Sequence, residues 1–291
     1  MGFFKSTIKT FFLAAALVYA SCSGGSGDAD NPNHDNYVIN DPEIFKLPSE
    51  LAEISGIDYY AKDSSLFAIA DNQKAFFKIK PGSSIHEWKL SDGRDCEDIA
   101  RHDSTLYILQ SNGDILEINF NGDRPQLNHY PFPREFGKNE FESLYADTAE
   151  NKLVLICKEC QSDKGNTVST FAFDIVNKSF SDSSYKIDGG KILSAAAFSE
   201  KNRFMPSGAA INPKDGMLYV LSSLNKCVAV IRPDGRVHEV FILNTQIYKQ
   251  PEGITFAPNG DMFISEEVAS YGGARLFHIK YLTPELMKPK K

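Results

Sequence analysis

The chain has 291 residues, a formal net charge of −7, and apolar and charged fractions of 42% and 24%. This length suffices for one large domain with a sizeable core. The acidic balance disfavours nucleic acid or an anionic lipid surface as the binding partner, and it is compatible with cation binding.

Residues 1–21 have the pattern of an export signal. Two lysines precede an apolar run over residues 11–20, which is too short to span a bilayer. The small residues before Cys22 resemble the bacterial lipobox, although Tyr19 stands where Leu is usual. We predict that Cys22 is lipidated and anchors the protein to the membrane of the cell envelope, at the outer membrane, on its periplasmic or surface side. Ordinary cleavage, with Cys22 incidental, is the alternative.

Residues 22–36 are rich in Gly, Ser, Asp and Asn, which predicts a flexible polar tether. The folded domain is expected over residues 37–285, followed by a short basic tail at 286–291.

One five-residue phrase recurs five times, at residues 53–57, 95–99, 140–144, 205–209 and 250–254. Its middle residue is Ser or Glu in every copy, and the copies are 42, 45, 65 and 45 residues apart. A period near 45 with several strands inside each unit is typical of a β-propeller blade. The sequence therefore predicts an all-β, five-bladed β-propeller.

A six-bladed ring is the alternative, but the long interval has only about 20 surplus residues, too few for another blade. The fifth unit lacks a fourth strand, and residues 44–47 resemble the fourth strands at 85–90 and 237–243. We expect this N-terminal strand to complete the last blade and close the ring. The surplus at residues 190–204 predicts either a short helix over one mouth of the ring or a surface excursion without a role.

Inner strands of all blades converge on a central channel, so residues at one repeat position come together in space. We expect the middle residues of the five copies to meet at one mouth of this channel. The residues two positions earlier should lie beside them, because side chains two apart in a strand share a face. The ends of the second strands should reach the same mouth. The predicted channel-lining residues are Ser55, Asp71, Asp95, Glu140, Ser207 and Glu267, and the predicted metal ligands are Glu53, Glu97, Glu142 and Glu252.

Crowded carboxylates raise one another's pKa unless a positive charge compensates them. Ca²⁺ is the favoured cofactor, because it takes oxygen ligands in irregular geometry. The alternative is that the acids accept backbone N–H bonds from the neighbouring blade and seal the channel, or that Arg94, Lys158 and Arg203 neutralise some of them.

Cys157 and Cys160 have the spacing of a local disulfide or of a redox or metal pair. They lie at a strand end without a second pair, which slightly favours buried thiols. The six histidines have no metal-ligand spacing, so we interpret them as structural or solvated.

The phrases at residues 53–57, 95–99 and 251–254 resemble the SdiA-regulated family of bacterial exported β-propellers, over about residues 45–282. Similar Pro-Glu-Gly-Ile units occur in NHL, strictosidine-synthase and gluconolactonase-like propellers. The resemblance implies a periplasmic or surface propeller without an established enzymatic activity, in which bound calcium is plausible. Met205 and Ser207 depart from the acidic pattern, which puts a complete acidic ring in doubt.

These observations predict an envelope lipoprotein that binds a small ligand or another envelope protein at its acidic channel, with Ca²⁺. One alternative is a metal-dependent hydrolase of the lactone or phosphoester type, and another is a scaffold that binds a protein on its flat face. An enzyme is the less favoured class, because Ser55 and Ser207 have no His at a neighbouring repeat position.

Overall fold

The computed structural model describes residues 36–71, 73–83, 85–91, 95–121, 124–198, 202–268 and 272–282. The predicted signal peptide, Cys22, the tether up to residue 35 and the tail lie outside these residues. None of the helices in the described part of the chain combines the length and apolar character that crossing a membrane requires.

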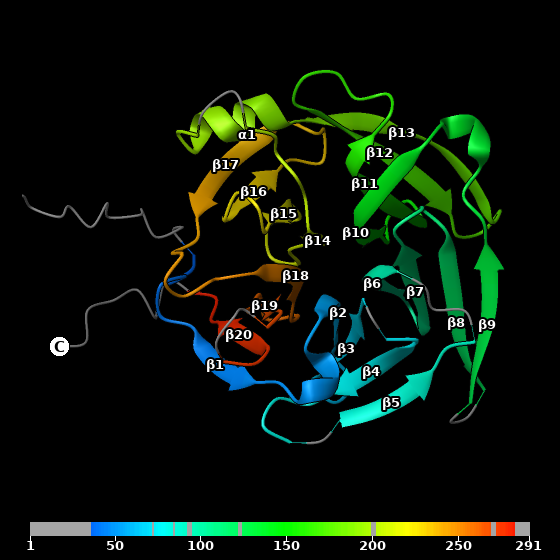
Figure 1. Ribbon diagram of the computed structural model, residues 1–291, viewed down its shortest axis with the longest axis vertical. Coiled ribbons are helices and arrows are strands. Elements are labelled where there is room, and N and C mark those ends of the chain that lie inside the picture. The colour runs from blue at the N-terminus through cyan, green and yellow to red at the C-terminus, as the bar shows by residue number, and fades with distance from the viewer. Residues whose placement is uncertain are drawn as a thin grey trace, which may run out of the picture. The chain divides into compact units, whose positions relative to one another are not determined.

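Five four-stranded antiparallel sheets surround a central channel, so the predicted five-bladed β-propeller is confirmed (Figure 1). Blade 1 consists of β2 (Ile54–Tyr60), β3 (Ser65–Ala70), β4 (Ala75–Ile79) and β5 (Ile85–Lys89). Blade 2 consists of β6 (Cys96–His102), β7 (Thr105–Gln110), β8 (Ile115–Asn121) and β9 (Arg124–Tyr130). Blade 3 consists of β10 (Asn139–Asp147), β11 (Lys152–Cys160), β12 (Thr167–Asp174) and β13 (Ser179–Asp188).

Blade 4 consists of β14 (Gly208–Ile211), β15 (Leu218–Ser222), β16 (Cys227–Ile231) and β17 (Val237–Ile242). Blade 5 consists of β18 (Pro251–Phe256), β19 (Met262–Glu266), β20 (Arg275–Ile279) and β1 (Glu43–Lys46). The short helices are η1 (Ser49–Leu51), η2 (Arg134–Phe136) and α1 (Gly189–Ala195).

Burial along each blade follows from its packing between two neighbours. Every residue of the middle strands β3, β15 and β16 is buried, because both faces of these strands contact an adjacent blade. The outer strand β5 is mostly exposed. Middle strands therefore read as continuous apolar runs, and outer strands read as alternating or polar ones.

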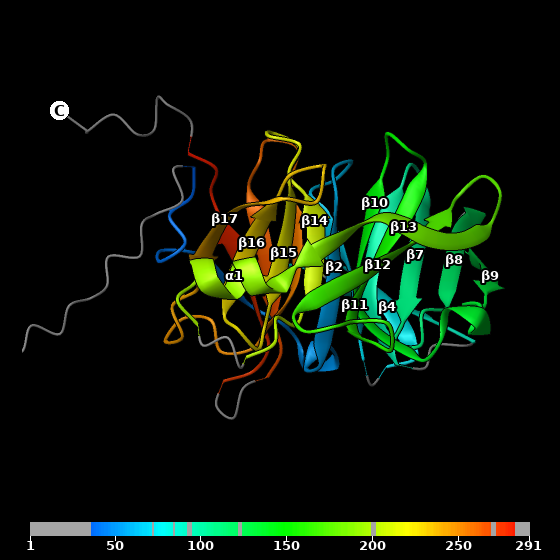
Figure 2. The same cartoon turned by 90° about the horizontal axis from the view of Figure 1, so that it is seen from above.

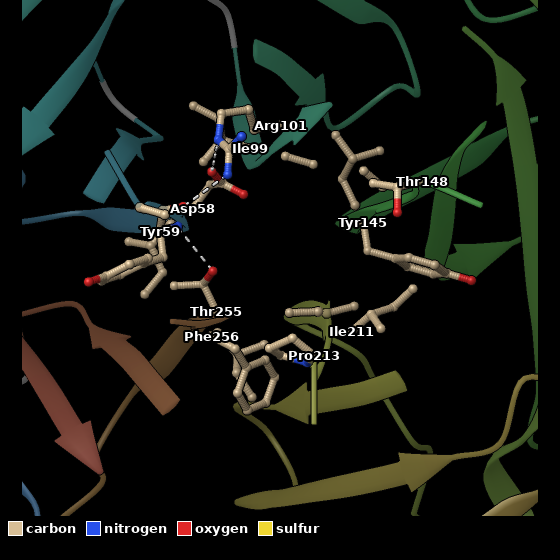
Figure 3. A pocket seen from close by; sticks show the side chains of 18 of the residues that line it. Asp58, Tyr59, Ile99, Arg101, Tyr145, Thr148, Ile211, Pro213, Thr255 and Phe256 are labelled. Carbon is tan, nitrogen blue, oxygen red and sulfur yellow. Dashed lines mark hydrogen bonds and ion pairs between the residues drawn. The ribbon is translucent and has the colours of Figure 1, made fainter. Parts of the chain in front are cut away.

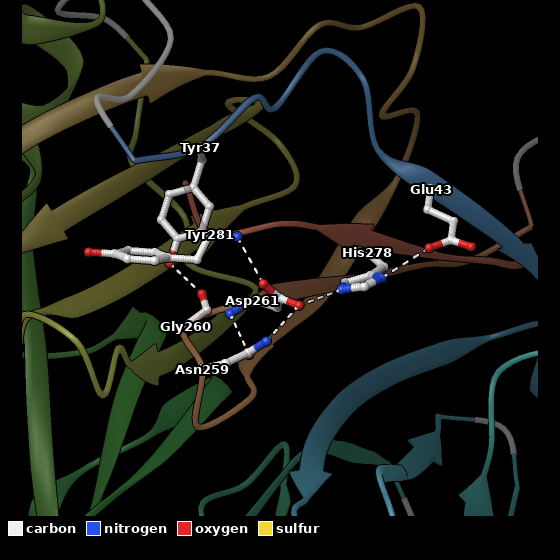
Figure 4. Close-up of polar contacts among 7 residues, drawn as sticks. All are labelled: Tyr37, Glu43, Asn259, Gly260, Asp261, His278 and Tyr281. Carbon is white, nitrogen blue, oxygen red and sulfur yellow. Dashed lines mark hydrogen bonds and ion pairs between the residues drawn. The ribbon is translucent and has the colours of Figure 1, made fainter. Parts of the chain in front are cut away.

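The N-terminal strand closes the ring, as the sequence predicted. Strand β1 pairs antiparallel with β20. Figure 4 shows the side chains around this closure: the Tyr37 hydroxyl donates to the carbonyl of Gly260 at 2.7 Å, and His278 lies between Glu43 at 3.2 Å and Asp261 at 2.9 Å. The closing strand is thus held by side chains as well as by its backbone ladder, and it gives blade 5 the fourth strand that the C-terminal part of the chain lacks.

Adjacent blades approach most closely at the start of their inner strands. A Cβ atom added to Gly253 would lie 2.5 Å from the Ser55 carbonyl oxygen, and one added to Gly56 would lie 2.6 Å from Asp98 Cα. We call the middle residue of each phrase the motif residue. In three of the five copies the next residue is glycine, and blade packing requires it there. This contact fixes the distance between neighbouring motif residues.

Helix α1 forms within the surplus segment, but it does not cover a mouth of the ring. It packs against β17 and β12 and buries Ile192 and Leu193 there. In two perpendicular views it lies on the outer side of β17 (Figure 1, Figure 2). Of the two predicted alternatives, the helix over one mouth is therefore wrong, because the apolar face of the helix packs between blades 3 and 4, which the sequence period does not reveal.

Candidate functional site: the acidic mouth of the channel

A β-bulge aims the motif side chain in four of the five blades. The register of the inner strand with the second strand shifts between Ile54 and Ile57, and the same shift recurs in blades 2, 3 and 5. The residues left out of the pairing include the motif residues Ser55, Glu97, Glu142 and Glu252. Bulges re-aim a side chain at the cost of a ladder bond. The repeat therefore encodes a bulge as well as a residue type.

Eight carboxylates gather at this end of the channel and act on one another electrostatically. They come from four different blades and include all four predicted metal ligands. We call this cluster the acidic mouth; its members are Glu53, Asp71, Asp95, Glu97, Glu140, Glu142, Glu252 and Glu267.

Glu97 is the strongly perturbed acid that blade 2 contributes to the acidic mouth. Burial, together with the charges of Glu142, Asp71 and Asp95, raises the pKa of Glu97 to about 8, while Lys158 opposes the shift. A carboxyl group with this pKa is largely protonated at neutral pH. Its ionised form lacks compensation by the protein itself.

Glu252 has the same property on the other side of the mouth. Burial, with the charges of Glu267 and Glu142, raises the pKa of Glu252 to about 8, although the Ser223 hydroxyl donates to it at 3.0 Å. Lys226 lies within range of Glu252 and Glu267, yet burial lowers the pKa of this lysine. The mouth therefore stores negative charge that its nearest cations do not fully balance.

Lys158 is the cation that enters the cluster. Its Nζ is paired with Glu142, and it lies 3.3 Å from Glu140. Burial lowers the pKa of Lys158, but these two carboxylates outweigh burial and raise it above its usual value. Burial likewise raises the pKa of Glu142 in spite of the lysine. Lys158 thus pairs with two carboxylates, and the other carboxylates of the acidic mouth still repel one another.

A disulfide joins Cys157 to Cys160 and brackets Lys158 in sequence. The register shift between Glu140 and Phe141 leaves Lys158 unpaired on β11, and the Cα atoms of Cys157 and Cys160 lie 5.8 Å apart, a separation that a disulfide spans. The sequence had slightly favoured buried thiols here. That interpretation was wrong because the strand continues to Cys160 in an irregular register rather than ending at Cys157.

The Ser207 side chain and the Ser55 backbone serve packing at this position. The Ser207 hydroxyl donates to the Pro251 carbonyl at 3.3 Å and accepts the Ser223 N–H at 3.1 Å, and Ser207 is buried between blades. The Ser55 carbonyl accepts the hydroxyl of Ser265 at 3.0 Å. These bonds link blade 4 to blade 5 and blade 5 to blade 1, and the motif position of blade 4 carries no carboxylate, so the charge that blade 4 brings to the mouth is that of Lys226.

The carboxylates offer the right donor chemistry for a hard cation but not a closed ligand shell. Within the described residues, no group of three or more His, Cys, Asp or Glu side chains is placed to hold a metal ion together. Oxygen donors from several strands suit Ca²⁺, which needs six to eight of them. Ligand roles for Glu53, Glu97, Glu142 and Glu252 stay a prediction.

Sequence reasoning missed a buried acid beside the motif. Asp98 is 3% exposed, and its carboxylate accepts the N–H of Ile99 at 2.8 Å and of Leu144 at 2.7 Å. Burial raises its pKa well above the usual value in spite of these two bonds. Asp98 ties blade 2 to blade 3 in the way proposed for the motif acids. Its signal was a carboxylate where three other copies have Gly.

A cavity at the other end of the channel was also missed (Figure 3). All five blades line it, and we call it the opposite mouth. Asp58 and Arg101 lie on one of its walls, and Arg101 Nε donates to Asp58 Oδ2 at 3.2 Å. Burial raises the pKa of Asp58 to about 6, and Arg101 opposes that shift. Both residues follow the motif by a few positions on the inner strands of adjacent blades, which is the signal that could have found them.

Comparison with known proteins gives one family and a broad fold likeness. A family model described as SdiA-regulated matches residues 43–271. No curated protein matches the chain. Among solved structures, the chain is similar to a glutaminyl cyclase of Myxococcus xanthus, with 15% identity, a TM-score of 0.57, and coverage of 83% of this chain and 96% of the other.

Two further structures are similar at the same level. A luciferin-regenerating enzyme shares 15% identity at a TM-score of 0.53, with coverage of 82% of this chain and 95% of the other. A calcium-binding protein, regucalcin, from Agrobacterium tumefaciens shares 11% identity at a TM-score of 0.50, with coverage of 84% and 94%. At such identities the likeness shows the propeller fold alone.

Proposed function

The chain belongs to the SdiA-regulated family, and on that premise we propose that it is a binding propeller of the cell envelope whose acidic mouth takes a positively charged ligand, with Ca²⁺ as the first candidate. The observation that carries the proposal is the excess of carboxylates over lysines at that mouth. Glu97 and Glu252, each with a pKa of about 8, mark the places where a cation would gain most.

A bound cation would compensate charge that the fold leaves unbalanced. Buried charges are normally paired or bound to a metal, because an unpaired buried charge is costly. Lys158 already serves Glu142 and Glu140, which leaves Glu97 and Glu252 for a ligand. Regucalcin is described as calcium-binding on a similar fold, which makes Ca²⁺ the ion to test first.

The test is a calorimetric titration of the purified protein with CaCl₂ at pH 8, alongside thermal unfolding with CaCl₂ or EDTA. We expect saturable binding and a higher Tm with Ca²⁺, since a ligand at 100 times its Kd stabilises by about 2.7 kcal/mol. The double variant Glu97→Gln with Glu252→Gln should lose both effects. Glu87→Gln, an exposed acid on the outer strand β5, is the matched control and should keep them.

Titration with putrescine, a linear organic dication, separates a metal from an organic ligand. Binding of putrescine without binding of Ca²⁺ would reject the metal and retain the cationic ligand. If neither cation binds, or if Glu87→Gln loses as much as the double variant, the proposed site is wrong.

The envelope part of the proposal depends on Cys22. Full-length protein expressed in a Gram-negative host should sediment with membranes, and Cys22→Ala should appear in the soluble fraction. Membrane association that persists in Cys22→Ala would reject the lipid anchor.

A further inference from the structure

The channel ends, away from the acidic mouth, in a cavity of about 380 Å³. Its lining comes from the inner strands β2, β6, β10, β14 and β18 and the turns that follow them, so it is coaxial with the ring (Figure 3). Small-molecule sites usually have volumes of about 300–1,000 Å³ and combine apolar walls with a few convergent polar groups. The opposite mouth meets both conditions.

Asp58 and Arg101 are the two charged residues among those that line this cavity. Their side chains are 19% and 25% exposed, and they are paired with each other. The net charge of the cavity wall is therefore zero, in contrast to the acidic mouth. A charged ligand would leave water here without gaining an uncompensated partner.

The guanidinium of Arg101 is held in place by the protein. Nη2 donates to the Tyr59 carbonyl at 3.2 Å, and Nη1 donates to the Asp103 carbonyl at 2.8 Å, in addition to the Nε bond to Asp58. A guanidinium carries five N–H groups. Within the described residues, the two that remain have no acceptor, so they are available to a ligand beside the Asp58 carboxylate.

Thr255 adds a polar group to the same region of the cavity. Its Oγ1 accepts the Tyr59 N–H at 3.1 Å, which leaves its own O–H to donate. Tyr145 and Ile211 lie across the cavity from Asp58 (Figure 3). The Tyr145 hydroxyl points away from the cavity, to the Tyr185 hydroxyl at 2.5 Å. The far wall is therefore mostly apolar, and Thr148 is the residue with a polar side chain beside Tyr145 on that side (Figure 3).

We propose that the opposite mouth is a second binding site, which takes a small uncharged molecule carrying an amide-type edge and an apolar body. An amide presents a carbonyl acceptor beside an N–H donor. The carbonyl meets the guanidinium of Arg101, and the N–H meets the carboxylate of Asp58. The apolar body packs against Ile211 and the ring of Tyr145. Every polar group is then satisfied without a net charge entering the cavity.

Three probes of nearly equal size separate charge from shape. N-acetyl-leucinamide is uncharged, N-acetyl-leucine is an anion and leucinamide is a cation. Binding of each to the full-length protein is followed by saturation-transfer NMR and by titration. At the opposite mouth we expect the uncharged probe to bind with a Kd of about 1 mM or tighter, and each charged probe to bind at least about tenfold more weakly. Binding of leucinamide that survives in Ala210→Leu is assigned to the acidic mouth, whose proposed ligand is a cation.

Two variants locate the site. Arg101→Met removes the donors, and Ala210→Leu fills the cavity without breaking a hydrogen bond; both should lose binding of the uncharged probe. Glu97→Gln, at the acidic mouth, should bind the uncharged probe as tightly as the wild type does. If Arg101→Met does not fold, Ala210→Leu decides.

Three outcomes would overturn the proposal. The uncharged probe shows no binding at about 10 mM, or a charged probe binds more tightly than it does at the site that Ala210→Leu blocks, or binding of the uncharged probe survives in every folded variant of the opposite mouth.

Discussion

The two ends of the channel are built from the same five inner strands, yet they treat charge in opposite ways. At the acidic mouth, bulges turn carboxylates from several blades toward one another, and one lysine serves two of them. At the opposite mouth the pairing is regular, and one carboxylate meets one guanidinium. Carboxylates at the acidic mouth therefore repel one another, whereas the two charges at the opposite mouth cancel.

This contrast shows what a repeat protein can encode at each position of its repeat. A position that recurs in every blade gathers like residues, so an acidic motif necessarily concentrates negative charge. Asp58 and Arg101 stand at different repeat positions, and they meet because adjacent blades are in contact. Residues that differ between blades can therefore form pairs of opposite charge. Residues that are the same in every blade form a cluster of like charge, which a bound ligand can neutralise.

We expect the largest loss of stability when the Asp58–Arg101 pair at the opposite mouth is removed. Arg101→Met leaves Asp58 buried without its partner and removes a donor from the Tyr59 carbonyl. We expect a loss of about 3 kcal/mol in the free energy of unfolding. The loss should be smaller at pH 5 than at pH 8, because Asp58, with a pKa of about 6, is mostly protonated at the lower pH. Urea unfolding at both pH values measures it.

Arg124→Met is the matched control for this prediction, since Arg124 is exposed on the outer strand β9. It should change stability by less than about 0.5 kcal/mol. Equal losses in the two variants, or a loss for Arg101→Met that does not depend on pH, would mean that the Asp58–Arg101 pair does not balance the opposite mouth.

At the acidic mouth, removing charged groups should raise the stability of the protein rather than lower it. The folded-state pKa values of Glu97 and Glu252 lie above their unfolded values, so the folded protein holds protons that the unfolded chain releases between about pH 4.5 and pH 8. Stability therefore falls as the pH rises through that window. Without Ca²⁺, the double variant Glu97→Gln with Glu252→Gln should be more stable than the wild type at pH 8, by about 1–2 kcal/mol.

At pH 5 the same double variant should match the wild type, because the two carboxyl groups are already neutral there. Thermal unfolding in EDTA reports the difference, as a rise of about 2–4 °C in Tm per kcal/mol for a chain of this size. A double variant that is less stable than the wild type at pH 8 would show that these acids are compensated by the protein itself.

The fold was predictable because its signal is repeated. Five copies of the phrase, spaced near 45 residues, fixed the blade count, and the missing fourth strand pointed to the closure by residues 44–47. The position of α1 was not predictable in this way. A segment that occurs once has no second copy to compare, and its place depends on a cleft that exists only after two blades pack.

The candidate site was predictable only as far as the repeat reaches. Convergence of Glu97, Glu142 and Glu252 follows from their equivalent positions. Asp98 and Arg101 stand where the other copies have different residues, so the repeat itself did not mark them, and only a comparison of the copies position by position could have found them. The carboxylates' pKa values also depend on burial and on Lys158, whose place is set by a bulge and a disulfide rather than by the motif.

The smallest expected effect on stability comes from Lys158, and it separates the two mouths most sharply. Lys158→Gln removes a pair whose side chains are 29% and 19% exposed, so we expect a loss of about 1 kcal/mol or less. The same change removes an internal competitor from the acidic mouth, so cation affinity at pH 8 should rise several-fold, by up to about tenfold. Binding of N-acetyl-leucinamide at the opposite mouth should not change. Stability and affinity thus move in opposite directions. A joint fall in both would mean that Lys158 builds the cation site, and the acidic mouth would then be a structure held by its own lysine rather than a cluster awaiting a ligand.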